Sequence, residues 1–228
     1  TPQGFSEKWK SIGLSNEDKE ALKPYANSPM IHIKHHKKGG YGRLLFIGGS
    51  YVKPMQCAKK VAIVDLDGKE KDKVRITPDH DWESRMGHSC VLFPHGDKDK
   101  IWLLGGVDKY GNALNDVWVS ENGTSWDNIN KKGIVQTKDT PVAMDWDARC
   151  MAGITVLLDH KGAKKSLWFG GGFSEIGGDE TGDIWRFENN NWTRVHQRKN
   201  SPFSINNDSY LSSGLAFTGR DDKASTGI

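Results

Sequence analysis

Ile101-Trp102-Leu103-Leu104-Gly105-Gly106 is an apolar run that ends in a pair of glycines, and the chain contains two counterparts of it. They are Leu44-Leu45-Phe46-Ile47-Gly48-Gly49 and Leu167-Trp168-Phe169-Gly170-Gly171-Gly172. The glycine pairs lie 57 and then 66 residues apart. A repeat of this length, built from short apolar runs, is typical of β-sheets stacked around an axis.

A second phrase follows the last two glycine pairs at nearly the same distance. It reads Asn115-Asp116-Val117-Trp118 with Trp126 further on, and Gly182-Asp183-Ile184-Trp185 with Trp192 further on. Glycine at the end of a strand allows backbones to converge where a side chain would not fit. The late tryptophan of each repeat offers a large apolar face to the neighbouring repeat. We therefore interpret both phrases as packing devices.

Each repeat is predicted to form four short antiparallel strands. Apolar runs bounded by turn residues indicate these strands, and Asn122-Gly123 is a strong signal for a two-residue hairpin. The expected strands are residues 61–65 and 74–76 in the first repeat, residues 87–93, 101–104, 116–119 and 125–129 in the second, and residues 153–158, 166–169, 184–187 and 192–195 in the third.

The repeats are placed at residues 28–79, 80–132 and 144–197. Residues 1–29 are expected to hold the closing strand of a preceding unit, around Trp9, and a short helix with Ser15 as its N-cap and Asp18 in the capping box. Residues 198–228 are expected to start an incomplete unit, because no fourth glycine pair follows. Either the chain is part of a larger assembly of sheets, or its two ends close a small fourth unit.

The composition excludes several classes of function. The chain of 228 residues has a net charge of only +3, with both signs mixed along it, so no nucleic-acid partner is expected. No stretch approaches the ~20 apolar residues of a membrane span. The three cysteines have no metal-like spacing, and the sequence predicts neither a metal nor a cofactor.

The second repeat resembles a kelch repeat. The residues that carry the resemblance are Arg85-Met86-Gly87-His88-Ser89, Leu104-Gly105-Gly106, Asn115-Asp116-Val117-Trp118 and Trp126. The third repeat is similar at Arg149, Gly171-Gly172, Trp185 and Trp192 but has Met151-Ala152-Gly153 at the Gly-His step, and the first keeps only Gly48-Gly49. The resemblance implies an all-β fold, a kelch-type β-propeller of four-stranded antiparallel blades.

A second resemblance concerns the segment Ser120–Trp126. It is similar to the Asp-box turn of sialidase propellers, although it is one residue short and has Asn122 in place of the Asp. This turn is structural in that family, so it implies no catalytic role. The same phrase also resembles bacterial extracellular kelch proteins, which favours an extracellular or cell-surface location.

Kelch propellers bind ligands through the loops between blades and the loops after the glycine pairs, and this resemblance selects the candidate residues. An aromatic ring, an arginine and a carboxylate together suit a sugar or a peptide acid. The alternative is that Arg85 and Arg149 each pair with a neighbouring carboxylate and brace adjacent blades. The candidate binding residues are Tyr51, Asp81, Trp82, Arg85, Asp108, Tyr110, Trp146, Arg149, Phe173 and Glu175.

No catalytic motif is found in the sequence, so no catalytic residue is assigned. We expect a binding module for a protein or a glycan. One alternative is a sugar-processing enzyme, mutarotase-like or oxidase-like, with its site at the channel mouth. An oxidase could draw on Cys57, Tyr51, His80 and His88, but no stretch matches the site of the copper radical oxidases. The other alternative is a structural subunit, whose partner would be the remainder of the propeller or another subunit.

Overall fold

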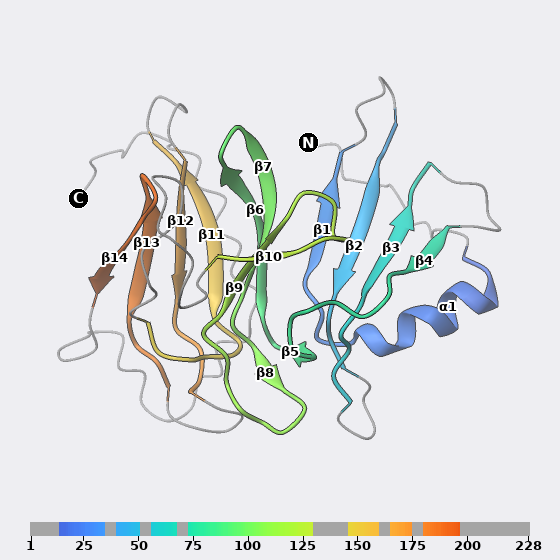
Figure 1. Ribbon diagram of the computed structural model, residues 1–228, viewed down its shortest axis with the longest axis horizontal. Helices are drawn as coiled ribbons and strands as arrows, with labels where there is room; N and C mark the ends of the chain where they lie inside the picture. The colour runs from blue at the N-terminus through green and yellow to red at the C-terminus, as the bar shows by residue number, and fades with distance from the viewer. Residues whose placement is uncertain are drawn as a thin grey trace, which may run out of the picture.

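The computed structural model describes residues 14–34, 40–50, 56–67, 73–129, 146–159, 165–174 and 180–196. These residues form three four-stranded antiparallel sheets, one two-stranded sheet and one short α-helix (Figure 1). The fold is therefore all-β, as the repeated apolar runs predict. Tyr51, Glu175, the closing strand expected around Trp9 and the incomplete unit expected at residues 198–228 lie outside the described residues.

Each large sheet is built from strands that are consecutive in the chain or nearly so. Sheet I contains β1 (Met30–Ile33), β2 (Arg43–Ile47), β3 (Val61–Asp65) and β4 (Val74–Ile76). Sheet II contains β6 (Ser89–His95), β7 (Lys98–Leu104), β9 (Val117–Ser120) and β10 (Asp127–Asn128). Sheet III contains β11 (Gly153–Leu158), β12 (Lys165–Gly170), β13 (Ile184–Glu188) and β14 (Asn191–His196). The small sheet pairs β5 (Arg85–Met86) with β8 (Val107–Asp108).

The sequence located these strands well. The predictions for residues 61–65, 74–76 and 153–158 are confirmed residue for residue, and the others agree to within three residues at either end. The helix α1 (Asn16–Leu22) has the predicted capping box, because Ser15 Oγ accepts a hydrogen bond from the Asp18 amide at 3.0 Å. A 3₁₀ turn, Lys23–Tyr25, follows it.

The prediction of a two-residue hairpin at Asn122-Gly123 is wrong. Val119 pairs with Asp127, so the segment Ser120–Trp126 forms a wider loop. Ser120 Oγ accepts the amide of Gly123 at 2.8 Å, and Asn122 Oδ1 accepts the amide of Thr124 at 2.8 Å. These side-chain acceptors replace the ladder bonds of a tight turn, which is the behaviour expected of Ser and Asn in loops.

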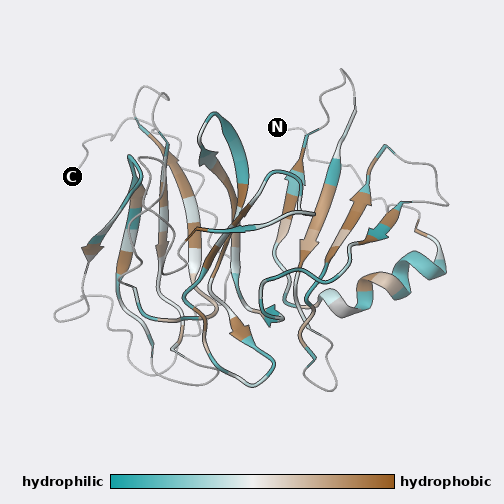
Figure 2. Cartoon of the chain, viewed as in Figure 1, coloured by the Kyte–Doolittle hydropathy of each residue, from teal (hydrophilic) through white to brown (hydrophobic). Residues whose placement is uncertain are grey.

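The core includes two apolar layers between the sheets and a smaller cluster of Met86, Val107 and Cys150. One layer lies between sheets I and II and includes Leu45, Ile47, Ile101 and Leu103, all of them fully buried. The second lies between sheets II and III and contains the aromatic side chains Phe93, Trp102, Trp146, Phe169, Trp185, Phe187 and Trp192. Figure 2 shows the hydrophobic residues concentrated on the middle strands. Trp126 and Trp192 pack in these layers, which confirms their predicted packing role.

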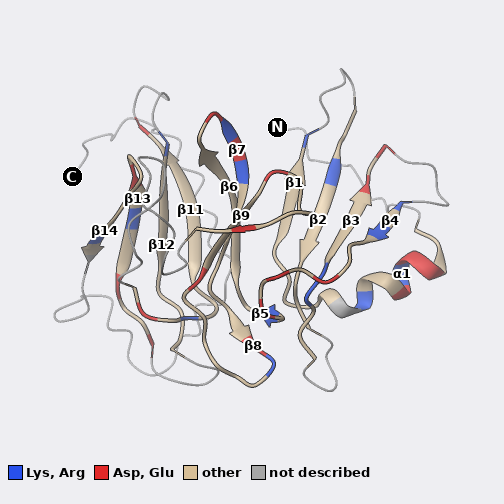
Figure 3. Ribbon diagram, viewed as in Figure 1, with Lys and Arg blue, Asp and Glu red and all other residues tan. Residues whose placement is uncertain are grey.

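The three large sheets lie side by side, with their first strands as neighbours. Strand β6 of sheet II contacts both β1 of sheet I and β11 of sheet III. The strands that end in the glycine pairs all run toward the lower edge of Figure 1, which we call the glycine end. Charged residues lie mainly in turns, at strand ends and on α1 (Figure 3). No helix among the described residues is long and apolar enough to cross a membrane.

Candidate functional site

The glycine pairs hold neighbouring sheets together at the glycine end. Gly49 donates its amide hydrogen to the carbonyl oxygen of Arg85 at 2.8 Å, and Gly106 donates to that of Arg149 at 2.9 Å. Each bond joins one sheet to the segment that enters the next. Both donors have φ values in the left-handed region, +104° and +101°, which favours glycine.

These positions also lack space for a side chain. A Cβ atom on Gly106 would lie 2.7 Å from the Cβ of His88, and one on Gly105 would lie 2.6 Å from the carbonyl oxygen of Arg149. Such distances are below van der Waals contact, so only glycine allows this approach of the two backbones. The packing role predicted for the repeated glycines is therefore present in the structure.

Arg85 makes a buried brace between strands that are distant in the sequence. Its Nη1 and Nη2 each donate to one carboxylate oxygen of Asp116 at 2.6 Å, and Nη1 also donates to the Gly105 carbonyl oxygen at 2.8 Å. The Trp118 indole donates to the same carboxylate at 2.6 Å. The guanidinium lies 5.8 Å from the centre of the Trp82 ring, a cation–π contact.

Arg149 repeats this brace in sheet III. Its Nη1 donates to Asp183 at 2.5 Å and to the Gly171 carbonyl oxygen at 3.3 Å. The Trp185 indole donates to Asp183 at 2.7 Å, and the guanidinium lies 5.7 Å from the Trp146 ring. Both arginine side chains are 0% exposed. The bracing arrangement, which the sequence left as an alternative, is the one that the structure has.

The braces change the ionisation of their carboxylates. Burial alone would raise the pKa of Asp116, but the hydrogen bonds and the charge of Arg85 outweigh it, and the pKa lies below its ordinary value. Asp183 is shifted in the same direction for the same reasons, with Arg149 as its partner. Both carboxylates are therefore held in the charged form that the arginines need.

The tryptophans that precede the arginines are core residues. Trp82 is 0% exposed and stacks on His80, with ring centroids 5.3 Å apart. Trp146 is 2% exposed and meets Phe169 edge to face. Neither ring presents a free face at the surface for a sugar. Of the two predicted site residues before β5 that the structure describes, Trp82 is buried and Asp81 is exposed.

The loop after β8 also reaches solvent. Tyr110 is 77% exposed, and the Lys109 ammonium lies 4.9 Å from the centre of its ring. Asp108 shapes this loop, because its carboxylate accepts the amides of Tyr110 at 2.8 Å and Asn112 at 2.9 Å. Although desolvation opposes the shift, these bonds lower the pKa of Asp108. Phe173 is half-buried in the matching loop of sheet III and bridges to Cys150 and Glu180.

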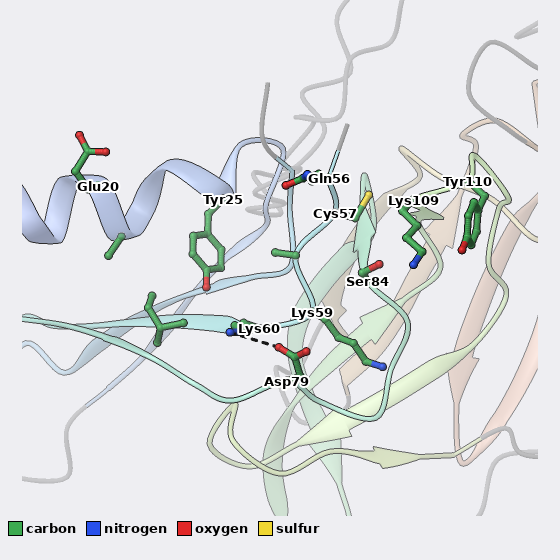
Figure 4. Close-up of a pocket in the computed structure, with 13 residues that line it drawn as sticks. Glu20, Tyr25, Gln56, Cys57, Lys59, Lys60, Asp79, Ser84, Lys109 and Tyr110 are labelled. Carbon is green, nitrogen blue, oxygen red and sulfur yellow. Dashed lines mark ion pairs between the residues drawn. The ribbon is translucent and has the colours of Figure 1, made fainter. Parts of the chain in front are cut away.

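A pocket of about 910 Å³ opens at the glycine end, between α1, sheet I and the loop after β8 (Figure 4). Tyr110 is the one member of the predicted site among its lining residues. Cys57 was considered only for the oxidase alternative, and the other lining residues were not predicted, because they come from separate segments with no repeated spacing. The lining residues are Glu20, Ala21, Tyr25, Gln56, Cys57, Ala58, Lys59, Lys60, Ile76, Asp79, Ser84, Lys109 and Tyr110.

The histidine and cysteine side chains do not form a metal site within the described part of the chain, where no group of three or more His, Cys, Asp or Glu residues comes together. Burial and the nearby charge of Arg85 lower the pKa of His88 to about 3, so this imidazole is neutral. Burial raises the pKa of the Cys57 thiol, which makes it a poor nucleophile near neutral pH.

Comparison with known proteins places few limits on this site. No protein-family model matches the chain, and no curated protein matches it. Among solved structures, one described as "Structure of YjhT" is similar with a TM-score of 0.38 and 13% sequence identity, covering 72% of this chain and 67% of that one. A similarity of that size carries no argument about function.

Proposed function

We propose that sheets I, II and III are successive blades of a kelch-type β-propeller that acts as a binding module for a protein or a glycan. The repeated brace supports the blade assignment. In two successive sheets an arginine Nη1 donates both to the carbonyl oxygen of a repeated glycine, at 2.8 and 3.3 Å, and to the Asp of the Asp-x-Trp phrase, at 2.6 and 2.5 Å. In a kelch-like repeat, the arginine, the glycine pair, the Asp and the Trp would all serve to pack one blade against the next.

The observation that carries the binding role is the pocket at the glycine end, with Tyr110 at its rim. The buried arginines and tryptophans are engaged in the braces and are not accessible to a ligand. A ligand therefore has to be recognised by the exposed loops. Loops on a rigid β scaffold are common places for binding residues. An exposed tyrosine offers a large contact area with one polar tip, which suits either a glycan or a protein surface.

The test is capture of a ligand by the purified protein, on a glycan array and from a panel of candidate proteins, followed by affinity measurement with Tyr110→Ala. The expected loss is tenfold or more, as for an aromatic residue central to an interface. Tyr41→Ala is the matched control, because Tyr41 is 74% exposed but lies between β1 and β2, at the opposite end of the sheets. Equal affinity in the two variants, or the absence of any captured ligand, would contradict the proposal.

A further inference from the structure

The charges that line the pocket are unequally paired. Lys60 faces Asp79 at 3.5 Å, and Glu20 is held by Lys23 at 2.5 Å. The acidic side chains of the lining are therefore both matched by a cation. Lys59 and Lys109 make no ion pair with any residue that the structure describes, although both line the same cavity (Figure 4).

The carboxylate of Asp108 also lies near this cavity, because its charge adds to burial in raising the pKa of the lining residue Cys57. Its oxygens are occupied by its own loop, since they accept the two backbone amides of Tyr110 and Asn112 and the Asn112 side-chain amide at 3.0 Å. Asp108 thereby fixes the loop that carries Lys109. It does not place a counter-ion on the Lys109 ammonium.

We propose that this pocket binds a small organic dianion, a phosphate monoester or a dicarboxylate, between Lys59 and Lys109. The proposal rests on the binding role assigned above to the same end of the molecule, and it names the ligand chemistry. Two ammonium groups that make no ion pair with a described residue, in one concave site, favour a doubly charged group, which attracts both at once. The cavity volume lies in the range of small-molecule sites.

The neutral side chains of the lining complete the recognition. The Ser84 hydroxyl and the Gln56 amide can donate to anionic oxygens, and hydrogen bonds to a charged acceptor are stronger than neutral ones. Tyr25 and Ile76 offer apolar surface for the organic part of the ligand. A lysine acts as a point charge without fixed fork geometry, so the site accepts both phosphate and carboxylate dianions.

The experiment is calorimetric titration of the full chain with phenyl phosphate and with phthalate, the two possible sources of the dianion, and with neutral benzyl alcohol. Wild-type protein is expected to bind at least one dianion and to bind benzyl alcohol at least tenfold more weakly. Lys59→Gln and Lys109→Gln are each expected to weaken dianion binding roughly fivefold. Raising the salt concentration from about 0.05 to 0.5 M should weaken it further, because exposed charges are screened.

Lys98→Gln is the matched control, since it removes the same charge from an exposed lysine that is paired with Glu121 in sheet II. Its dianion affinity should equal that of wild type. Equal losses in all three variants, or equal affinity for benzyl alcohol and the dianions, would overturn the proposal. A neutral ligand that needs Tyr110 but neither lysine would also overturn it, while leaving the proposed binding module in place. Dianion binding without any captured macromolecule would support it and count against the binding module.

Discussion

Arg85 and Asp116 form a two-bonded ion pair in which both N–O distances are 2.6 Å and the arginine side chain has no exposed surface. The two residues are 31 positions apart in the chain. The pair joins the short strand β5 to the residue that immediately precedes β9, beside the second glycine pair. The Arg85 side chain is thereby bound to sheet II, while its carbonyl oxygen accepts the Gly49 amide from sheet I. Arg85 therefore fixes the position of sheet I relative to sheet II.

Asp116→Ala is therefore expected to lower the free energy of unfolding by about 3 kcal/mol. The substitution leaves the Arg85 guanidinium buried without its counter-ion, and an uncompensated buried charge is costly. Urea unfolding followed by tryptophan fluorescence measures the loss. The double variant Arg85→Met/Asp116→Leu should lose less, because it removes both charges together.

The control for this prediction is Glu121→Ala, which removes an exposed carboxylate that faces Lys98 at 3.2 Å. A surface pair of this kind contributes about 0–1 kcal/mol. If Asp116→Ala and Glu121→Ala had the same small effect, the buried brace would not be the stabilising contact that its geometry indicates.

Gly106→Ala is expected to destabilise the protein by more than Gly111→Ala. The two glycines have similar φ values, +101° and +91°, so both substitutions carry the strain of a left-handed residue, about 1 kcal/mol or more. Only the Cβ at position 106 meets other atoms, whereas nothing lies within 4 Å of a Cβ at position 111. The extra loss, at least about 1 kcal/mol, measures the steric part alone. Equal urea midpoints for Gly106→Ala and Gly111→Ala would show that the backbone around Gly106 can move away from Met86 and His88 at no cost.

The sheets were predictable from the sequence because their signals are local. Apolar runs, turn residues and the Ser15 capping box each depend on residues a few positions apart. The burial of Arg85 and Arg149 was harder to decide. Arginine beside tryptophan and a carboxylate is equally compatible with a ligand site and with a brace. The decisive partners, Asp116 and Asp183, are 31 and 34 residues away and are brought in by the sheet register.

The pocket could not have been predicted for a related reason. Lys59, Ser84 and Lys109 belong to three separate connections, and no repeat or motif links them. Their meeting depends on where sheet I lies against the loop after β8 and on the position of α1. Tyr110 was predicted as a binding residue because it follows a glycine pair. A glycine pair at the end of a strand indicates a loop, whatever segments of the chain that loop faces.

The stability of the protein is expected to rise with pH between about pH 4 and pH 6.5. The pKa of His88 is about 3 in the fold, against an ordinary value of 6.5, so in this range the unfolded chain binds a proton that the fold does not. The slope contributed by one such group approaches 1.4 kcal/mol per pH unit. His80, whose pKa burial also lowers, adds to it. Below about pH 4 the lowered pKa values of Asp116 and Asp183 act in the same sense, because protonation of these carboxylates breaks the braces.

Urea unfolding at pH 4, 5, 6 and 7 tests this dependence. His88→Gln should flatten the slope, whatever its effect on stability at pH 7, because it removes the buried imidazole whose pKa is lowered in the fold. An unaltered slope in His88→Gln would mean that this imidazole is accessible to protons in the folded state.

Met151 stands where the second repeat has Gly87, and the two residues share the same backbone conformation, with φ of +55° and +60°. The Met151 amide donates to the Gly87 carbonyl oxygen at 2.6 Å, which joins the equivalent positions of neighbouring sheets. A methionine in the left-handed region is strained, and its side chain is 39% exposed, so little packing offsets the strain. Met151→Gly is therefore expected to be more stable than Met151→Ala by about 1 kcal/mol.

The matched control for this comparison is Ala26→Gly, in the equivalent segment of sheet I, where φ is −62°. Glycine relieves no strain at that position and should lower the free energy of unfolding by roughly 0.5–1 kcal/mol. If glycine were unfavourable at position 151 as well, the left-handed conformation there would not be imposed by the bond to Gly87. If glycine instead raises the free energy of unfolding at position 151 and lowers it at position 26, the backbone contact between sheets favours glycine at position 151, where the third repeat has methionine.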